Sequence, residues 1–153
     1  MREAKEPTDA PEHVADVPYL DGVSVLVVDD DPSALDFVRT TLERYGAFVV
    51  TAGSAKEGRD RFKREHPDVI VSDLVMAHED GLQFIRDIRK MENPAEHVTP
   101  AAALTALART DDRKRALNAG YQMHVAKPID PDELAVTVER LAHRSAAAPR
   151  LEQ

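Results

Sequence analysis

Short apolar runs alternate with longer amphipathic segments along most of this chain. The runs contain four or five residues each, are rich in Val, Ile or Ala, and lie at 24–28, 48–52, 69–73, 101–104 and 123–126. Runs this short, bounded by polar or turn residues, predict strands buried on both faces, as in a parallel sheet. The run at 101–104 is almost all alanine, a poor strand former, and we assign it from its place in the alternation.

Apolar residues recur at helical spacing in the segments that follow these runs. Helix starts are marked by Pro32 behind an acid, by the capping box Ser54-Ala55-Lys56-Glu57, and by Asp130-Pro131-Asp132-Glu133. Helices are therefore expected at about 32–45, 54–66, 82–92, 108–119 and 131–143. The helix at 108–119 has few large apolar residues, Leu117 being the main one, so we expect it to be the least firmly held.

The alternation predicts a single α/β domain. Connections of this length form right-handed crossovers between parallel strands. Five strands and five helices then predict a flavodoxin-like, doubly wound five-stranded parallel sheet with strand order 2-1-3-4-5. We expect this domain to span residues 22–143. Residues 1–21, with three prolines and no apolar period, are expected to form a flexible leader or linker whose Tyr19-Leu20 pair docks onto the domain, and residues 144–153 a flexible tail.

Composition narrows the class of protein without changing the fold prediction. A chain of 153 residues with 42% hydrophobic and 31% charged residues is typical of one globular domain with tails. No apolar run approaches the roughly 20 residues of a membrane-spanning helix, so no membrane insertion is expected. The absence of cysteine excludes disulfides and thiolate metal sites and fits a cytoplasmic protein. A net charge of −8 argues against direct nucleic-acid binding.

Polar side chains gather where the predicted strands end, which is where ligands bind in open parallel sheets. These ends carry Asp29, Asp30, Asp73, Thr105 and Lys127. Three carboxylates close together repel one another unless a cation neutralises them. Because only oxygen donors are on offer, the fitting metal is Mg²⁺, with Mn²⁺ second.

This set of residues predicts phosphoryl transfer. Asp73 would attack phosphorus, while Lys127 and the Thr105 hydroxyl would meet the charge on the phosphoryl oxygens. Each residue taken alone also has an ordinary explanation. Asp73 and Thr105 could each cap the helix that follows, and Lys127 could be a solvated lysine.

The segment from about Val23 to Ala142 resembles a receiver domain of bacterial two-component response regulators. The resemblance rests on the strand that runs into Asp29-Asp30-Asp31, on the acceptor segment from Ser72-Asp73 to Asp80-Gly81, and on Ala103-Leu104-Thr105-Ala106 and Val125-Ala126-Lys127-Pro128. It implies Asp29 and Asp30 as metal acids, Asp73 as phosphoacceptor and metal ligand, the Val75 carbonyl as a further metal ligand, and Thr105 and Lys127 as phosphoryl contacts. It also implies a phosphorelay whose donor is a histidine kinase or a histidine phosphotransfer protein, with no enzyme activity beyond self-catalysed phosphoryl acceptance and slow loss.

Four positions depart from the usual receiver pattern. Ala77 stands where the acceptor segment usually has proline, and this frees the backbone of the loop that offers the Val75 carbonyl, so weaker metal binding is expected. His124 stands where an inward-turning aromatic is common; it can serve the switch and add pH sensitivity, or be a partly buried polar residue. Val75 and Leu107 are apolar where polar side chains can guide a water, so slow self-dephosphorylation is expected.

Phosphorylation is expected to draw Thr105 inward, to make room for His124, and to re-pack the helix near Arg109–Asn118. The resemblance to receiver domains implies that the last two helices and the strand between them then form a partner surface. The downstream partner is unknown. About ten residues follow the last expected helix, too few for an effector domain. The chain is therefore expected to be a stand-alone receiver or part of a larger protein, and its proline-bearing leader favours a hybrid histidine kinase.

Two other functions remain open from the residues. Val25–Ser33 also resembles the opening motif of haloacid-dehalogenase-type phosphohydrolases, with Asp29 as nucleophile and Asp31 as general acid. Turnover of a phosphate ester that depends on Asp29 and not on Asp73 would support that enzyme. The second alternative is a receiver-like interaction module that binds partners without phosphorylation, which only Ala77 favours.

Overall fold

The computed structural model of the chain describes residues 19–77, 79–106 and 110–151. Within these residues, five strands form one parallel sheet in the order β2-β1-β3-β4-β5, as the sequence predicted. The strands are β1 (Ser24–Val28), β2 (Phe48–Ala52), β3 (Val69–Asp73), β4 (Ala101–Thr105) and β5 (Met123–Ala126). The helices are α2 (Pro32–Arg44), α3 (Ala55–Glu65), α4 (Gly81–Met91), α5 (Thr110–Ala119) and α6 (Pro131–Leu151).

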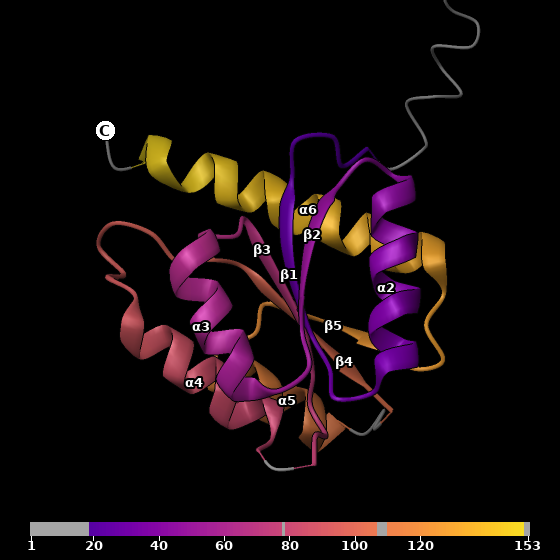
Figure 1. Cartoon of the computed structure of the whole chain (residues 1–153). Helices are drawn as coiled ribbons and strands as arrows, with labels where there is room; N and C mark the ends of the chain where they lie inside the picture. Colours follow the sequence, from indigo (N-terminus) through magenta and orange to yellow (C-terminus); the bar gives the residue numbers. More distant parts are fainter. Residues whose placement is uncertain (1–18, 78, 107–109, 152–153) are drawn as a thin grey trace, which may run out of the picture.

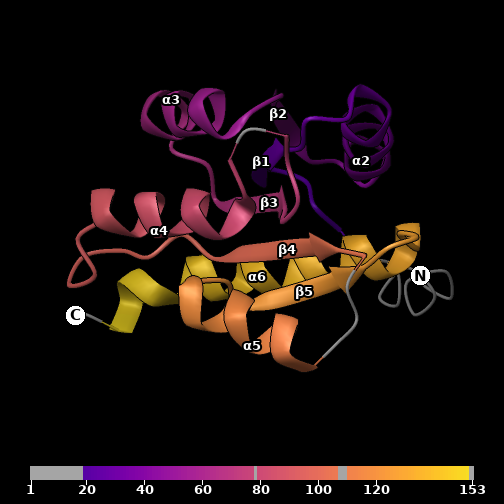
Figure 2. The ribbon, with the colours of Figure 1, turned by 90° about the horizontal axis from the view of Figure 1, so that it is seen from below.

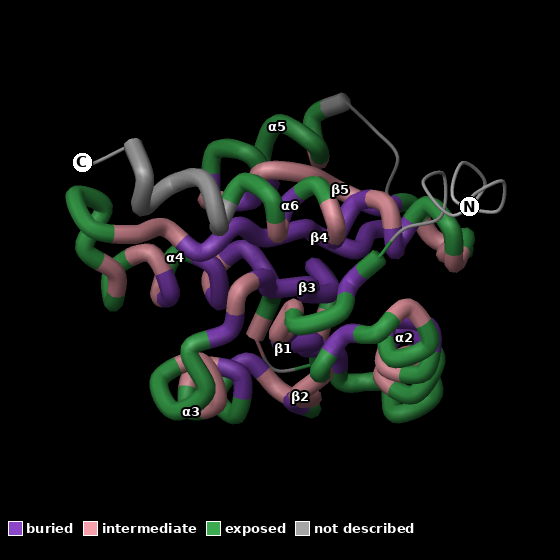
Figure 3. The backbone as a smooth tube through the Cα atoms, turned by 90° about the horizontal axis from the view of Figure 1, so that it is seen from above, coloured by how far each residue is buried: buried purple, intermediate pink, exposed green. Residues whose placement is uncertain are grey.

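Helices cover both faces of the sheet (Figures 1 and 2). Helices α2 and α6 pack on one face, and α3, α4 and α5 on the other. Successive side chains of a strand point to opposite faces, so each strand contributes to two cores. In β1, for example, Val25 and Val27 face the first pair of helices, while Leu26 and Val28 face the other three. Figure 3 shows the result, with the inner strands β1, β3 and β4 buried, the edge strands β2 and β5 mostly intermediate, and the outer sides of the helices exposed.

Strand β4 is the one that the sequence marked least clearly, and the structure explains its composition. Every residue of β4 is buried. Ala101 and Ala103 lie in the core under α4 and α5, and Ala102 in the core under α6. Because alanine projects little from a strand, helices can approach the sheet closely on both sides of β4. The predicted strand is confirmed and extends one residue further, to Thr105.

Helix α5 is held by small side chains. Leu117, its main large apolar residue, is 53% exposed. Ala116 and Ala119 are buried instead. The helix therefore rests on the sheet through small side chains, which brings it close to the sheet and leaves Leu117 on the outside.

The structure continues on both sides of residues 22–143. In the Tyr19-Leu20 pair, which was expected to dock onto the domain, Leu20 is fully buried and its main-chain N–H donates to the carbonyl of Tyr45, while Tyr19 is exposed. At the other end α6 continues to Leu151, although residues from Arg144 onward were expected to form a tail. Among the helices of the described residues, none combines the length and hydrophobicity needed to cross a membrane.

Candidate functional site

The site lies at the edge of the sheet where the parallel strands end. Asp29 directly follows β1, Asp73 is the last residue of β3, Thr105 is the last residue of β4, and Lys127 directly follows β5. The strand register brings these ends level, since Asp73 pairs with Leu104 and Thr105 pairs with Ala126. Residues nearly 100 positions apart in the chain are thereby placed at one edge.

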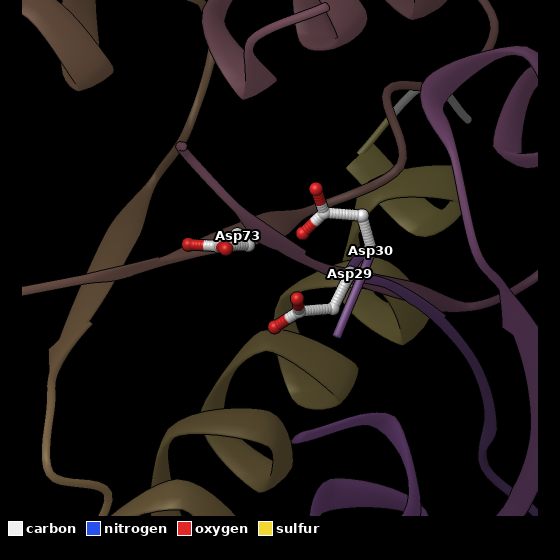
Figure 4. Close-up of side chains that lie close together, drawn as sticks. All are labelled: Asp29, Asp30 and Asp73. Atoms are coloured by element: carbon white, nitrogen blue, oxygen red, sulfur yellow. The ribbon is translucent and has the colours of Figure 1, made fainter. Parts of the chain in front are cut away.

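Three carboxylates meet at this edge. One oxygen from each of Asp29, Asp30 and Asp73 lies within 4.8 Å of the others. Figure 4 shows the three side chains beside one another, two from the end of β1 and one from β3. Asp29 and Asp73 are buried, whereas Asp30 is exposed. The structure thus brings together the three acids that the sequence singled out.

Asp29 is the most confined of the three acids. It is 1% exposed, and its Oδ1 accepts a hydrogen bond of 2.9 Å from the main-chain N–H of Asp31. Among the described residues, its buried Oδ2 has no hydrogen-bond partner. Burial raises the pKa of Asp29; the Asp31 N–H acts against this, and the nearby charge of Asp73 raises it further. A carboxylate in this position is short of positive charge.

Lys127 supplies positive charge beside two of the acids. Its Nζ lies 3.3 Å from Oδ1 of Asp73 and 3.8 Å from Oδ2 of Asp29. The main-chain N–H of Lys127 donates to the carbonyl of Thr105 at 2.9 Å, which joins the ends of β4 and β5. The Lys127–Pro128 peptide bond is cis. The ammonium group of Lys127 thus lies beside Asp73, the carboxylate that the sequence predicted to be the acceptor.

Thr105 lies on β4, which pairs with the strand of Asp73, and His124 lies on β5, which pairs with β4. Thr105 is buried at the end of β4. His124 is half-buried in β5, where it pairs with Ala103. Since Met123 and Val125 contribute to the core under α6, the alternation of the strand turns His124 toward the side of α4 and α5. Leu107, whose apolar side chain was one reason to expect slow self-dephosphorylation, lies outside the described residues.

The loop between β3 and α4 is fixed to the acids by two main-chain amides. The N–H of Val75 donates to Oδ1 of Asp73 at 3.4 Å, and the N–H of Ala77 donates to Oδ2 of Asp30 at 2.6 Å. The side chain of Val75 is 64% exposed. Asp80 caps α4 by accepting from the N–H of Gln83 at 2.8 Å.

Two residues that support the site were not recognised from the sequence. At Gly81 a Cβ atom would collide with the carbonyl oxygen of Asp73 and lie 2.9 Å from Cα of Leu74, so glycine is required where α4 starts against the end of β3. Tyr121 is buried, and its hydroxyl donates to the carbonyl of Gly81 at 2.8 Å. The Asp80-Gly81 pair was a visible signal for a helix start, but the close approach of two backbones has no local signature.

Asp31 lies outside the acid cluster. Its side chain is the N-cap of α2 and accepts from the N–H of Ser33 at 3.0 Å. This is the capping role expected of the acid before Pro32. The arrangement gives no support to Asp31 as a general acid next to Asp29, which the phosphohydrolase alternative requires.

The donor set fits a small divalent cation. All the available donors are oxygens, which suits Mg²⁺ or Mn²⁺ and not metals that prefer sulfur or imidazole. The buried Oδ2 of Asp29 and the mutual repulsion of the three acids are relieved by a bound cation.

The sheet and the acids define a doubly wound α/β protein with an acidic site at the carboxyl edge. The family model "Response regulator receiver domain" matches residues 25–139. The chain belongs to this family, the receiver domains of two-component response regulators.

Relatives and solved structures agree with this assignment. Response regulator Rre1 of Synechocystis is 35% identical over 82% of this chain and 54% of its own length. An uncharacterized 14.6 kDa protein of Leptolyngbya boryana is 42% identical over 77% of this chain and 88% of its own. The receiver domain of the Francisella response regulator 1452 has a TM-score of 0.73 and 32% identity, covering 80% of this chain and 98% of that chain.

Several curated relatives are longer than this domain. The probable transcriptional regulatory protein TcrX of Mycobacterium tuberculosis is 33% identical over 80% of this chain, but the match covers 51% of TcrX. The chain thus spans about half the length of Rre1 and TcrX.

Proposed function

We propose that this receiver domain accepts a phosphoryl group on Asp73 from the phosphohistidine of a histidine kinase or histidine phosphotransfer protein. The observation that carries the proposal is the placement of Lys127 Nζ 3.3 Å from Oδ1 of Asp73, beside Asp29 and Asp30. An acceptor needs a carboxylate oxygen at the end of a strand, and positive charge to meet the phosphoryl oxygens. Asp73 has both.

The transfer requires little covalent chemistry from the protein. A carboxylate oxygen of Asp73 forms a bond to phosphorus while the bond from phosphorus to the donor imidazole nitrogen breaks, and that nitrogen keeps the electron pair. Lys127 meets the charge on the phosphoryl oxygens, and the Thr105 hydroxyl donates to one of them. Burial of Asp73 between β1 and β4 holds the attacking carboxylate in one place.

Asp29, Asp30, Asp73 and the carbonyl of Val75 would hold Mg²⁺, with Mn²⁺ as an alternative. When bound, the cation neutralises charge on the acids and on the phosphoryl oxygens. Asp29 and Asp30 then serve as its ligands and Asp31 only as the cap of α2. Phosphohydrolase chemistry centred on Asp29 and partner binding without phosphorylation remain the less favoured alternatives.

The proposed switch connects the phosphorylated acid to α5. Added negative charge at Asp73 would draw Thr105 toward it, leaving room for His124 to turn inward. Helix α5 packs through the small side chains of Ala116 and Ala119, which bury little apolar surface, and this supports a rearrangement there. The surface formed by α5, β5 and α6 would then bind a downstream protein according to phosphorylation state.

The setting of the domain is part of the same proposal. A cytoplasmic phosphorelay is the setting in which histidine kinases or phosphotransfer proteins reach a receiver, and the leader of residues 1–21 suits attachment behind a hybrid kinase. The domain 22–143 would act through protein partners and not by binding nucleic acid itself. The net charge of the whole chain, −8, is consistent with this, because it disfavours contact with a phosphate backbone.

The direct test is intact mass after incubation with Mg²⁺ and acetyl phosphate. The wild-type protein is expected to gain one phosphoryl group, which hydroxylamine removes, and Asp73→Asn is expected to gain none. Asp80→Asn is the matched control, because asparagine caps a helix as well as aspartate does and leaves Asp73 intact. If the wild type gains no mass, even from a phosphorylated histidine phosphotransfer protein, a phosphorylation-independent module is the better account.

Slow loss of the phosphoryl group is expected because the exposed side chain two residues after Asp73 is apolar. The side chain of Val75 has no polar atom that could hydrogen-bond a water attacking the acyl phosphate. Val75→Asn should therefore shorten the lifetime of the phosphorylated protein severalfold, measured by the decay of the added mass. Val75→Ala, which stays apolar, should decay like the wild type. Equal decay in all three proteins would remove Val75 as the cause.

A further inference from the structure

The acceptor loop carries a hydrogen bond that depends on the absence of proline. At position 77, where proline would have no N–H, the main-chain amide of Ala77 donates to Oδ2 of Asp30 at 2.6 Å. A short bond from an amide to a charged carboxylate is stronger than one between neutral groups. Alanine at this position therefore adds a contact to the acid cluster.

The hydrogen bond from Ala77 acts on Asp30, whose side chain is the most exposed of the three acids and the most free to move. Asp29 and Asp73 are buried, whereas Asp30 is exposed and has room to turn toward solvent. The three acids lie close enough to repel one another, and repulsion favours the outward position of the exposed one. The Ala77 amide draws Asp30 toward the loop and holds it beside Asp29 and Asp73.

The loop that carries the amide is itself held in place. Glu79 forms an ion pair of 2.7 Å with Arg59 of α3, and Arg59 also lies 3.3 Å from Asp87 of α4. These side chains are less than one-third exposed. Nearer the strand, the N–H of Gly81 donates to the carbonyl of Leu74 at 2.8 Å, which closes the loop. The amide of Ala77 is thus presented from a loop anchored on both sides.

We propose that Ala77 is a positioning residue for the cation site, acting through its main-chain N–H on the Asp30 carboxylate. The inference rests on the proposed function, since it assigns Asp30 as a ligand of the cation. It reverses the expectation from the sequence. Loss of the usual proline was expected to weaken metal binding, whereas the observed hydrogen bond means that alanine supports it.

The first experiment is calorimetric titration of the metal-free protein with Mg²⁺. Ala77→Pro removes the N–H and is expected to weaken Mg²⁺ binding by about threefold to tenfold, as for loss of one hydrogen bond to a charged group at an exposed position. Ala77→Val is the matched control, because valine stiffens the backbone but keeps the N–H, and it should bind like the wild type. Equal or tighter binding by Ala77→Pro overturns the inference and restores the expectation from the sequence.

A second measurement needs no metal and no proline. In the metal-free wild type, the Ala77 amide should exchange its proton with solvent more slowly than expected for an exposed loop and should resonate downfield. Asp30→Ala should abolish both properties at Ala77 and leave the Gly81 amide, which donates to Leu74, unchanged. An Ala77 amide that behaves alike in both proteins overturns the inference.

The two experiments separate this inference from the function on which it rests. A wild-type protein that binds no Mg²⁺ and accepts no phosphoryl group contradicts the proposed function and the inference together. A wild type that binds Mg²⁺ and is phosphorylated, with an Ala77→Pro variant of equal affinity, contradicts only the role of Ala77.

Discussion

Tyr121 is the largest fully buried side chain of the described residues, and its one polar atom has a partner at the site. Its hydroxyl donates to the carbonyl of Gly81, at the first turn of α4. Burial is the main reason that the pKa of Tyr121 is raised above its ordinary value of 10.0. A residue between α5 and β5 thereby supports the helix that begins behind the acceptor acid.

Tyr121→Phe tests this support and its dependence on pH. At neutral pH the variant should lose about 1 kcal/mol of unfolding free energy, the net value of one hydrogen bond. Above pH 10 the unfolded chain releases the phenolic proton while the folded chain keeps it, so the wild type loses stability as pH rises. The gap between wild type and variant should therefore shrink above pH 10. Urea unfolding at neutral and alkaline pH measures it, and a gap that widens would contradict the buried neutral phenol.

The charged residues of the site were visible in the sequence, whereas the residues that support them were not. Asp29, Asp73 and Lys127 lie at the ends of strands, and a parallel sheet brings strand ends together whatever the details of packing. Tyr121 could have been any buried aromatic, because its partner is a carbonyl 40 residues away.

At the scale of elements, the decisive contact is the start of α4 against the end of β3. Gly81 lies so close to Asp73 that a side chain has no room there. This closeness lets α4 begin directly behind the acceptor and keeps the loop from Leu74 to Asp80 short. The position of the loop is thereby tied to the position of the helix.

Gly81→Ala should disturb both the helix and the site. The new Cβ would press on the Asp73 carbonyl and on Leu74, and we expect a loss of about 1–3 kcal/mol in unfolding free energy, typical of overpacking. Gly53→Ala is the matched control, because a Cβ there would meet only Oε1 of Glu57 at 3.7 Å, an ordinary contact. Urea unfolding of the two variants measures the difference, and equal stabilities would show that the backbone at Gly81 can yield.

Prediction of elements from the sequence succeeded where patterns are local. The side chains of Asp31, Ser54 and Asp130, which mark the predicted helix starts, each accept from a main-chain amide of the first turn, because a cap and its helix are neighbours in the chain. The buried face of α5 had no such local signal, since the choice between Leu117 and the alanines depends on how closely the helix approaches the sheet. Local hydrophobicity favours the larger side chain, whereas the space available favours the smaller ones.

At the scale of the whole molecule, negative charge is unevenly distributed. The chain has a net charge of −8, and three of its acids are concentrated at one edge of the sheet. Concentrating like charges, two of them buried, lowers the stability of the folded state unless a cation is bound. The fold therefore couples its stability to the occupancy of its site.

Removal of Mg²⁺ should make this coupling measurable. At a free concentration one hundred times the dissociation constant, Mg²⁺ should raise the unfolding free energy by about 2.7 kcal/mol, and a chelator should abolish the gain. Asp29→Asn should show little gain, while Asp36→Asn, which changes an exposed acid of α2, should keep it. Thermal unfolding with and without Mg²⁺ tests this, and an equal gain in Asp29→Asn would place the cation elsewhere.

The order of strands and helices could be read from the sequence, and so could the acidic residues, the threonine and the lysine at the strand ends. This was possible because hydrophobic period is a local property and because a doubly wound parallel sheet aligns the ends of its strands. The folded structure was needed to show that the Ala77 amide reaches Asp30, that α4 passes against Asp73, and that Leu117 is exposed. These contacts depend on distances between distant segments, which are set by how each helix packs on the sheet and leave no periodic trace in the chain.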